Sequence, residues 1–193
     1  MATKVQFSPT ALPRGPWRCR NTRTVYDNAW IRVHHDEVVT PAGTDGIYGR
    51  IHFHNKAIGI IPIDADNHTW LVRQHRYTLG EDSWEIPEGG SPAGENLLDT
   101  AKRELEEETG LKASDWELLM RLHTSNSVTD EEAFIYIARD LSQGEMAPDA
   151  TEDIVARRVP LAEAVQMVMD GRITDAMSVA GLLKAGWMFG VKG

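Results

Sequence analysis

Four of the six residues from Arg103 to Glu108 are carboxylates, and they fall in a stretch with helical periodicity. Acidic side chains three or four positions apart on a helix repel each other by roughly 0.2–0.5 kcal/mol per pair. Negative charge near the C-terminal end of a helix is also disfavoured by the helix dipole. Lys102 and Arg103 are too few to balance these acids. A bound cation would remove the repulsion, so the stretch predicts a metal site rather than an ordinary solvated face.

The predicted helix runs from about Asn96 to Thr109, with Gly110 at the position of a C-cap glycine. At about 100° per residue, three of the glutamates share one arc that borders the apolar stripe, whereas Glu106 points elsewhere and is expected to be solvated. The three glutamates are Glu104, Glu107 and Glu108, and the stripe consists of Leu97, Leu98, Ala101 and Leu105. The predicted metal ligands therefore flank the buried side of the helix.

The spacing of fixed residues around this helix resembles a known signature. Gly89 is followed after five residues by Glu95, and after seven more by the run RELEEETGL, which begins at Arg103. This pattern resembles a complete Nudix box, and the resemblance to Nudix hydrolases covers about residues 48 to 185. It implies an α/β fold, namely an α/β/α sandwich with a mixed sheet, and structural roles for Gly89, Glu95 and Arg103.

The resemblance also implies metal-dependent hydrolysis of a diphosphate bond. Clustered carboxylates suit a hard cation, Mg²⁺ with Mn²⁺ as a possibility, because such ions take oxygen ligands. The implied ligands are Glu104, Glu107 and Glu108, together with the backbone carbonyl of Glu88. The general base is left open between Glu152, which we favour, Asp153 and Glu107.

Composition limits the classes of partner. The chain has 193 residues and a hydrophobic content of 41%, which suits one globular domain with a small accessory element. A net charge of −9 and a pI near 5.2 argue against nucleic acid or an anionic membrane as the main partner. A single cysteine, Cys19, fits a reducing compartment, and no leader-like segment or long apolar run is visible. We therefore expect a cytoplasmic protein with a small-molecule substrate.

The N-terminal part divides into two predicted segments. Residues 1–19 are expected to form an irregular arm, because they contain several prolines and show no periodicity. Residues 20–47 are expected to form an antiparallel sheet, the start of a three-stranded meander that extends to His54. By resemblance to nucleotide-sugar Nudix enzymes, this sheet is exchanged between the subunits of a homodimer. Residues 48–193 form the predicted Nudix hydrolase domain.

The remaining elements follow from hydrophobic patterning. Residues 57–64 and 68–77 are expected to be two strands, joined around residues 65–67, that form the centre of the sheet, since the first is apolar enough to be buried on both faces. Further strands are predicted at 83–87, 116–124, 131–139 and 153–161, and helices at 161–171 and 174–189.

Two features resemble those of the ADP-ribose and nucleoside-diphosphate-sugar pyrophosphatase branch. They are the long N-terminal meander and the acidic loop of residues 149–153. The implied reaction converts a nucleotide sugar, of the ADP-ribose, ADP-glucose or GDP-mannose type, to a nucleoside monophosphate and a sugar phosphate. Asn126 occupies the place where ADP-ribose pyrophosphatases usually have a proline, so the particular sugar stays open. The alternatives are hydrolysis of a dinucleotide or nucleoside triphosphate, or a non-catalytic nucleotide-sugar sensor.

The candidate substrate-binding residues lie outside the box. Arg76 is predicted to hold the diphosphate, and Trp30 and Tyr48 to stack on the base across the dimer. Arg50, Asn126, Ser127 and Glu131 are further candidates. Each candidate also has a structural interpretation. Arg76 could be an ordinary surface arginine, and Trp30 and Tyr48 could simply be buried in a small sheet. The loop that contains Asn126 and Ser127 could be an ordinary polar turn.

Overall fold

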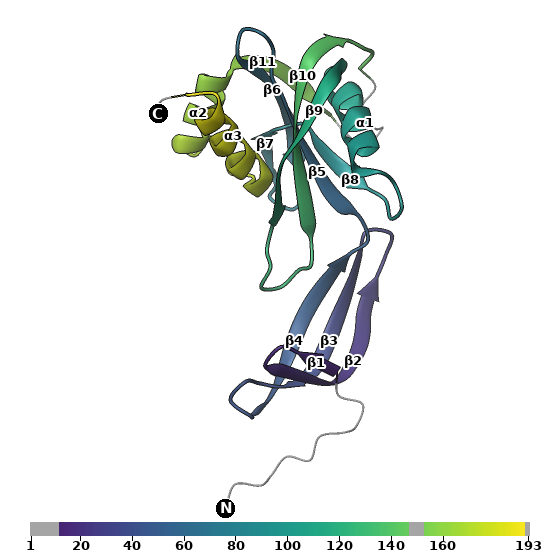
Figure 1. The fold of residues 1–193 in the computed structure, drawn as a ribbon. Coiled ribbons are helices and arrows are strands. Elements are labelled where there is room, and N and C mark those ends of the chain that lie inside the picture. The colour runs from purple at the N-terminus through teal and green to yellow at the C-terminus, as the bar shows by residue number, and fades with distance from the viewer. Residues whose placement is uncertain (1–11, 147–152, 192–193) are drawn as a thin grey trace, which may run out of the picture. The chain divides into compact units, whose positions relative to one another are not determined.

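The computed structural model describes residues 12–146 and 153–191. They divide into two compact units, one built from the chain up to His54 together with Ser125–Glu131, and the other from Asn55–Thr124 and the chain from Glu132 onward (Figure 1).

The first unit is an antiparallel sheet in the order β1-β2-β3-β4. Its strands are Leu12–Arg14, Trp17–Asp27, Ile31–Val39 and Asp45–Phe53. The loop of residues 125–131 is attached to β4: the Ile51 amide donates to the Val128 carbonyl at 2.8 Å, and the Asp130 amide donates to the Ile51 carbonyl at 3.1 Å. This loop is therefore a structural part of the N-terminal unit, although it lies some seventy residues later in the sequence.

The N-terminal prediction needs two corrections. Residues 12–19 are not irregular, because β1 and the start of β2 pair in a tight hairpin in which Leu12 lies opposite Cys19. The division at residue 47/48 is also wrong, because β4 runs without a break to Phe53 and pairs with β3 along its length. Residues 1–11 lie outside the described part of the chain.

The second unit contains two sheets. The first has the order β8-β5-β10-β9 and the second the order β11-β6-β7. The first sheet consists of β5 (Lys56–Pro62), β8 (Glu88–Ser91), β9 (Leu111–His123) and β10 (Glu132–Gln143), and the second of β6 (His68–Arg76), β7 (Glu81–Glu85) and β11 (Val155–Pro160). β5 and β10 run parallel, and the other neighbours are antiparallel.

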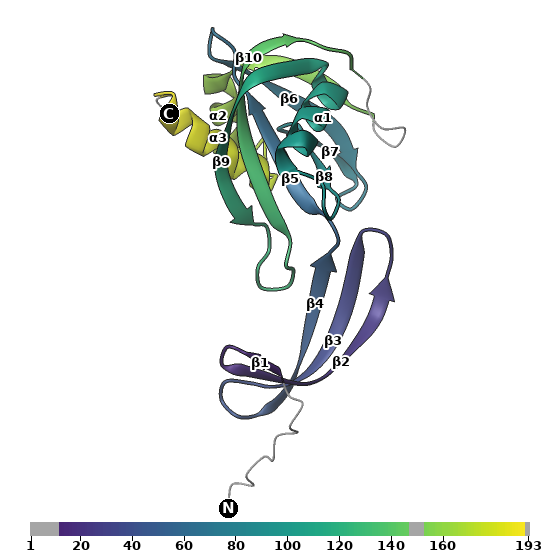
Figure 2. The same cartoon turned by 45° about the vertical axis from the view of Figure 1, so that its right-hand side comes forward.

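Helices cover opposite sides of these sheets (Figures 1 and 2). The side chains of β5 alternate: Ile58 and Ile60 pack with Leu105 of α1 (Leu97–Thr109), whereas Ile61 packs in the cluster that contains residues of α2 (Leu161–Met169) and α3 (Ala176–Met188). β5 is thus buried on both faces, which explains its continuous apolar sequence. The α/β/α sandwich with mixed pairing is confirmed.

The expectation that residues 57–64 and 68–77 together form the centre of one sheet is wrong in one respect. Each strand is central, but β5 and β6 belong to different sheets. Asp64 Oδ1 accepts hydrogen bonds from the amides of Asp66 and His68, both at 2.9 Å, and Asn67 has a φ of 56°. This tight turn carries the chain out of one sheet and into the other.

In the described residues, no helix is both long enough and apolar enough to span a membrane.

Candidate active site

The site is centred where strand β8 meets α1, at Gly89, which pairs with Ile58 of β5. A Cβ atom on Gly89 would lie 2.1 Å from Cδ of Glu104 and 2.2 Å from its Oε1, far inside contact distance. A side chain at position 89 would therefore displace the Glu104 carboxylate, which lies against the backbone there. Glu104 is 7% exposed and Glu108 is fully buried, so two of the three predicted ligands are held on the inner side of the helix.

Glu108 joins the helix to the start of β8. Its Oε2 accepts a hydrogen bond from the Glu88 amide at 2.9 Å. Burial raises the pKa of the Glu88 carboxyl well above its ordinary value, and the charges of Asp175 and Glu85 add to this effect, while Arg76 opposes it. The predicted box residues Glu88, Glu104 and Glu108 are thus brought together in a poorly solvated, strongly acidic environment.

Arg103 lies across the acidic side of the helix. Its Nη1 is 2.8 Å from Glu104 Oε1 and 2.8 Å from Glu107 Oε2, and its Nη2 donates to the Gly90 carbonyl at 3.4 Å. Its Nε lies 3.8 Å from Glu95. Glu106 is half-buried and pairs with Lys112 at 3.0 Å. Arg103 therefore offsets part of the repulsion among the glutamates and links the loop to the helix.

Arg76 reaches the same region from β6. Its Nε donates to Glu85 Oε1 at 2.9 Å, and its Nη2 lies 2.6 Å from Glu88 Oε1. Burial alone would lower the pKa of Arg76, but the hydrogen bond to Glu85 and the charges of Glu88 and Glu85 raise it. Arg73 instead lies 3.4 Å from Asp82 among exposed side chains. The structure thus places Arg76 beside the box, where its guanidinium holds two acidic side chains.

Helix α3 fixes the segment that leads into the box. The buried Ser178 hydroxyl accepts a hydrogen bond from the Ile86 amide at 2.9 Å, and the Ser178 amide donates to Asp175, the N-cap residue, at 2.7 Å. The Pro87 carbonyl accepts from the Ile60 amide at 2.8 Å. Successive peptides before Gly89 are therefore held by α3, β5 and α1.

The donor chemistry fits a hard divalent cation. Glu88 Oε2 is buried and has no hydrogen-bond partner among the described residues, so it could accept a further ligand. In residues 12–146 and 153–191, no three histidine, cysteine, aspartate or glutamate side chains are already grouped as a metal-ligand set. Glu104 and Glu107 are both paired with Arg103.

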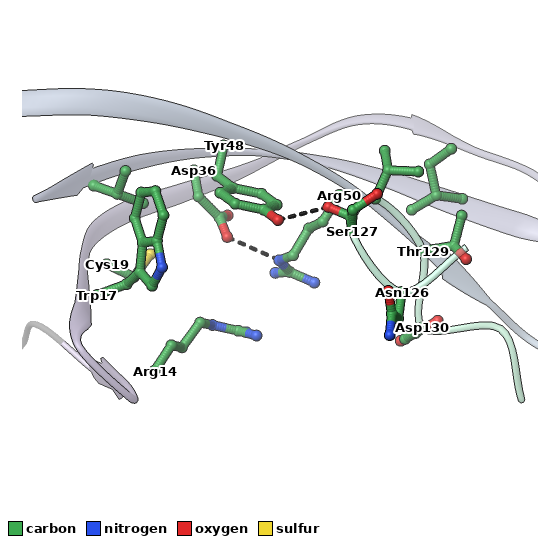
Figure 3. Close-up of a pocket in the computed structure, with 13 residues that line it drawn as sticks. Arg14, Trp17, Cys19, Asp36, Tyr48, Arg50, Asn126, Ser127, Thr129 and Asp130 are labelled. Carbon is green, nitrogen blue, oxygen red and sulfur yellow. Dashed lines mark hydrogen bonds and ion pairs between the residues drawn. The ribbon is translucent and has the colours of Figure 1, made fainter. Parts of the chain in front are cut away.

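The remaining described candidates belong to the first unit. Tyr48, Arg50, Asn126 and Ser127 line one cavity there, and Figure 3 shows Tyr48 and Arg50 on the strand side and Asn126 on the loop side. Glu131, at the end of the loop, is half-buried. The structure therefore brings the predicted β4 and loop residues together, although they come from distant parts of the sequence.

Trp30 is not part of this group. It is 68% exposed and precedes Ile31, which pairs with Phe53, whereas Tyr48 pairs with Asp36. The run from Trp30 to Asp36 spans roughly 20 Å at about 3.3 Å per residue. Trp30 and Tyr48 of one chain therefore cannot stack on the same base.

Of the candidate general bases, Glu152 lies outside the described residues. Asp153 is exposed, just before β11, and the Glu107 side chain is 36% exposed and bound to Arg103.

The comparisons with known proteins agree with this architecture. A family model described as NUDIX domain matches residues 53–178, and one described as nucleoside diphosphate sugar hydrolase N-terminal domain matches residues 17–51. The chain is 34% identical to an ADP-ribose pyrophosphatase of Mycobacterium tuberculosis, over 84% of this chain and 80% of the relative. It is 33% identical to the methanol dehydrogenase activator of Bacillus methanolicus, over 82% and 86%.

Among solved structures, the crystal structure of an ADP compounds hydrolase is similar, with a TM-score of 0.79, 26% identity and 98% of each chain covered. The sandwich and its glutamate-bearing helix thus define a hydrolase of the Nudix family, to which this chain belongs. Within that family, the chain also carries the N-terminal element described for nucleoside diphosphate sugar hydrolases. Nudix hydrolases generally use divalent metal ions.

Several residues of these sites were not predicted. Glu85 stands in the WEIPEGG segment, and a buried acid beside the box could have been suspected there. Asp175 is the second residue of the helix predicted at 174–189 and has the character of an N-cap. Ser178 gave no sequence signal, because its partner, Ile86, is 92 residues away.

Proposed function

We propose that this enzyme hydrolyses the diphosphate bond of a nucleoside-diphosphate sugar, of the ADP-ribose, ADP-glucose or GDP-mannose type, with Mg²⁺ or Mn²⁺. The observation that carries the proposal is the set of buried carboxylates packed against strand β8 at Gly89, in a chain that also has the N-terminal element of nucleoside diphosphate sugar hydrolases. The names of two similar proteins, an ADP-ribose pyrophosphatase and an ADP compounds hydrolase, support the substrate class.

In this proposal, Glu104, Glu107, Glu108 and the Glu88 carbonyl hold the cation. When bound, the cation supplies charge compensation at the phosphoryl oxygens and activates water. Binding of the cation would require Arg103 to give up part of its ion pairing with Glu104 and Glu107, so that their carboxylate oxygens are available as ligands. Arg76 keeps the Glu88 side chain in place and is close enough to the box to contact the diphosphate.

Water attacks one phosphorus atom, and the bond from that phosphorus to the bridging oxygen breaks. The water proton passes to a carboxylate: we propose Glu152, with Asp153 and Glu107 as alternatives. The products are a nucleoside monophosphate and a sugar phosphate. A carboxylate is suited to this step, because a positioned general base contributes typically 10²–10⁴-fold to such reactions.

We also propose that the enzyme is a cytoplasmic homodimer whose N-terminal sheets are exchanged, with neither nucleic acid nor a membrane as partner. The separation of Trp30 from Tyr48 within one sheet supports the exchange, because the two rings can enclose one base only if they come from different subunits. The single cysteine supports the cytoplasmic location, and the net charge of −9 argues against nucleic acid or a membrane as partner.

The test is product analysis with a substrate panel in Mg²⁺: ADP-ribose, ADP-glucose, GDP-mannose, UDP-glucose, a dinucleotide and the nucleoside triphosphates. We expect a nucleotide sugar to be cleaved to a nucleoside monophosphate and a sugar phosphate. Turnover of triphosphates alone would refute the proposed substrate class. Tight binding of a nucleotide sugar without turnover would indicate a sensor instead.

A further inference from the structure

Glu85 is a buried carboxylate that lies outside the box. It is the last residue of β7, is only 2% exposed and precedes Gly89 by four residues. A carboxylate removed from water is costly unless it is paired. Its pairing comes from β6, where Arg76 supplies the opposite charge and the Gln74 side chain donates to Glu85 Oε2 at 3.4 Å. The burial of Glu85 is therefore tied to Arg76.

Arg76 is not paired with the acid that lies opposite it in the sheet. Glu81 is directly opposite Arg76 in the register of β6 and β7, and it is exposed. Directly opposite residues in an antiparallel pair have Cβ atoms roughly 4.5–5.5 Å apart, so Glu81 is within easy reach. In the described residues, the ion pairs of Arg76 are instead with Glu85 and Glu88. The guanidinium is thus directed to the end of β7 that leads into the box.

The contact between Arg76 and Glu85 fixes the guanidinium in direction as well as in position. Nε of Arg76 lies 2.9 Å from Glu85 Oε1 and 3.1 Å from Oε2, and Nη2 lies 2.5 Å from Oε2. Two neighbouring N–H groups on one edge of the guanidinium therefore meet both oxygens of one carboxylate, which is a bidentate arrangement. Nη2 also donates to Glu88 Oε1 at 2.6 Å. Together these contacts prevent the plane of the guanidinium from rotating.

The other edge of the guanidinium remains open. Within the part of the chain that the structure describes, the hydrogen bonds of Arg76 use Nε and Nη2 but not Nη1, and the side chain is 35% exposed. Acids outnumber the arginine here, because the charge of Asp175 also acts on Arg76. Arg76 therefore adds little net positive charge to this region. What it offers to an anionic group is a hydrogen-bond donor in a fixed direction.

We propose that Glu85 is a positioning residue for substrate binding, which orients Arg76 so that Nη1 is directed at the diphosphate of the substrate. The inference rests on the proposed function for the identity of that substrate, and it gives a role to a residue outside the box. Glu85 does not touch the substrate and acts only through Arg76. Because direction rather than charge is the contribution, lysine should not replace Arg76.

The experiment compares Glu85→Gln, Arg76→Ala, the double variant and Arg76→Lys with the wild type. The control is Glu81→Gln, at an exposed glutamate of the same strand. KM, kcat and the Mg²⁺ concentration for half-maximal activity are measured with the nucleotide sugar that the wild type hydrolyses best. Titration calorimetry with inorganic diphosphate in Mg²⁺ gives a second readout that needs no turnover. Chemical denaturation checks that each variant is folded; glutamine has the size of glutamate and keeps one acceptor oxygen.

We expect Glu85→Gln to raise KM about tenfold or more and to weaken diphosphate binding by a similar factor, as for loss of a hydrogen bond to a charged group. Its kcat should stay within about threefold of the wild type, and its Mg²⁺ requirement within about twofold. In the Arg76→Ala background, Glu85→Gln should add less than about twofold, because the two residues act as a unit. Arg76→Lys should raise KM nearly as much as Arg76→Ala, and Glu81→Gln should stay within about twofold throughout.

Wild-type KM and diphosphate affinity in Glu85→Gln would overturn the inference, as would absence of diphosphate binding by the wild type. An equal effect of Glu85→Gln with and without Arg76 would also overturn it, since a general structural role acts in both backgrounds. So would a raised Mg²⁺ requirement with an unchanged KM, because Glu85 would then support the box instead. If Glu85→Gln does not fold, Arg76→Lys decides: a normal KM in that variant would overturn the inference.

The proposed function fails separately from this inference. If no nucleotide sugar is hydrolysed, but diphosphate binding depends on Glu85 only when Arg76 is present, the proposed reaction alone is wrong. If a nucleotide sugar is hydrolysed and Glu85→Gln changes neither KM nor diphosphate affinity, the positioning role of Glu85 alone is wrong.

Discussion

At the scale of single residues, the contact between Gly89 and Glu104 leaves no room for a side chain. In Gly89→Ala, the new Cβ would overlap the Glu104 carboxylate, with 2.1 Å to its Cδ. Either the carboxylate, at the end of its side chain, or the backbone of β8 must move. We expect a fall in kcat of about tenfold to a hundredfold and a higher Mg²⁺ concentration for half-maximal activity, as for loss of support around metal ligands.

Gly49→Ala is the matched control for this change, because a Cβ at Gly49 would meet no atom within 4 Å and its φ is not positive. Kinetic measurements over a Mg²⁺ series compare the two variants. Wild-type activity and metal dependence in Gly89→Ala would show that the placement of Glu104 is not needed.

Ser178 supports the segment before the box, because its hydroxyl accepts a hydrogen bond from the Ile86 amide. Ser178→Ala leaves that buried amide without its acceptor, at a cost of about 1–3 kcal/mol in the free energy of unfolding. Because Ile86 lies two residues before Glu88, we also expect the apparent Mg²⁺ affinity to fall. Chemical denaturation and Mg²⁺-dependent kinetics measure the two effects. The exposed Ser142→Ala should change stability by no more than about 0.5 kcal/mol; an equal change in both variants would contradict the account.

At the scale of elements, Asp36 joins three strands of the N-terminal sheet. It lies on β3, accepts from Thr22 on β2, and pairs with Arg50 on β4 at 2.8 Å. Burial raises the pKa of Asp36, but the hydrogen bonds from Thr22 and Arg50 outweigh it, so the pKa lies below the ordinary value of 3.8. The ionised carboxylate therefore stabilises the folded sheet above about pH 4, and this contribution is lost as the pH falls through the lowered pKa.

Asp36→Asn should lower the free energy of unfolding at pH 7 by roughly 1–3 kcal/mol. The difference from the wild type should shrink as the pH falls below about 4, because the wild-type carboxylate becomes protonated. Denaturation curves at several pH values test this. Asp66→Asn, at a side chain that is 79% exposed, serves as the control. A difference that stays constant with pH would rule out the charge of Asp36 as its cause.

Local patterns predicted much of the fold. The helix of the box begins and ends within one residue of its prediction, because Asn96 caps Leu98 and Gly110 has a φ of 68°. The division between β5 and β6 was missed, because both strands have the composition of central strands and only the turn at Asp64 separates their sheets. The cavity shared by Tyr48 and Asn126 could not be predicted, since it forms between a strand and a loop that are far apart in the sequence.

At the scale of the whole molecule, the proposed exchange of N-terminal sheets can be tested by mixing two inactive variants. Trp30→Ala should impair base binding, and Glu108→Gln should impair the box. If Trp30 serves the box of the other subunit, a mixed dimer contains one site with neither change, and activity returns. Light scattering checks that the protein is a dimer. A monomer, or a mixed dimer with no recovered activity, would contradict the exchange.

The central claim is that the buried glutamates of α1 perform metal-dependent hydrolysis. The most direct test compares two variants, Glu108→Gln and Glu106→Gln. The measurement is kcat in Mg²⁺ for the nucleotide sugar that the wild type hydrolyses best. Both residues are on the same helix, but Glu108 is fully buried against Glu88, whereas Glu106 pairs with Lys112. We expect Glu108→Gln to lose about a hundredfold or more, and Glu106→Gln to stay within about twofold of the wild type, as for a surface pair of small energetic weight. Near-normal turnover by Glu108→Gln, or equal losses in both variants, would contradict the account.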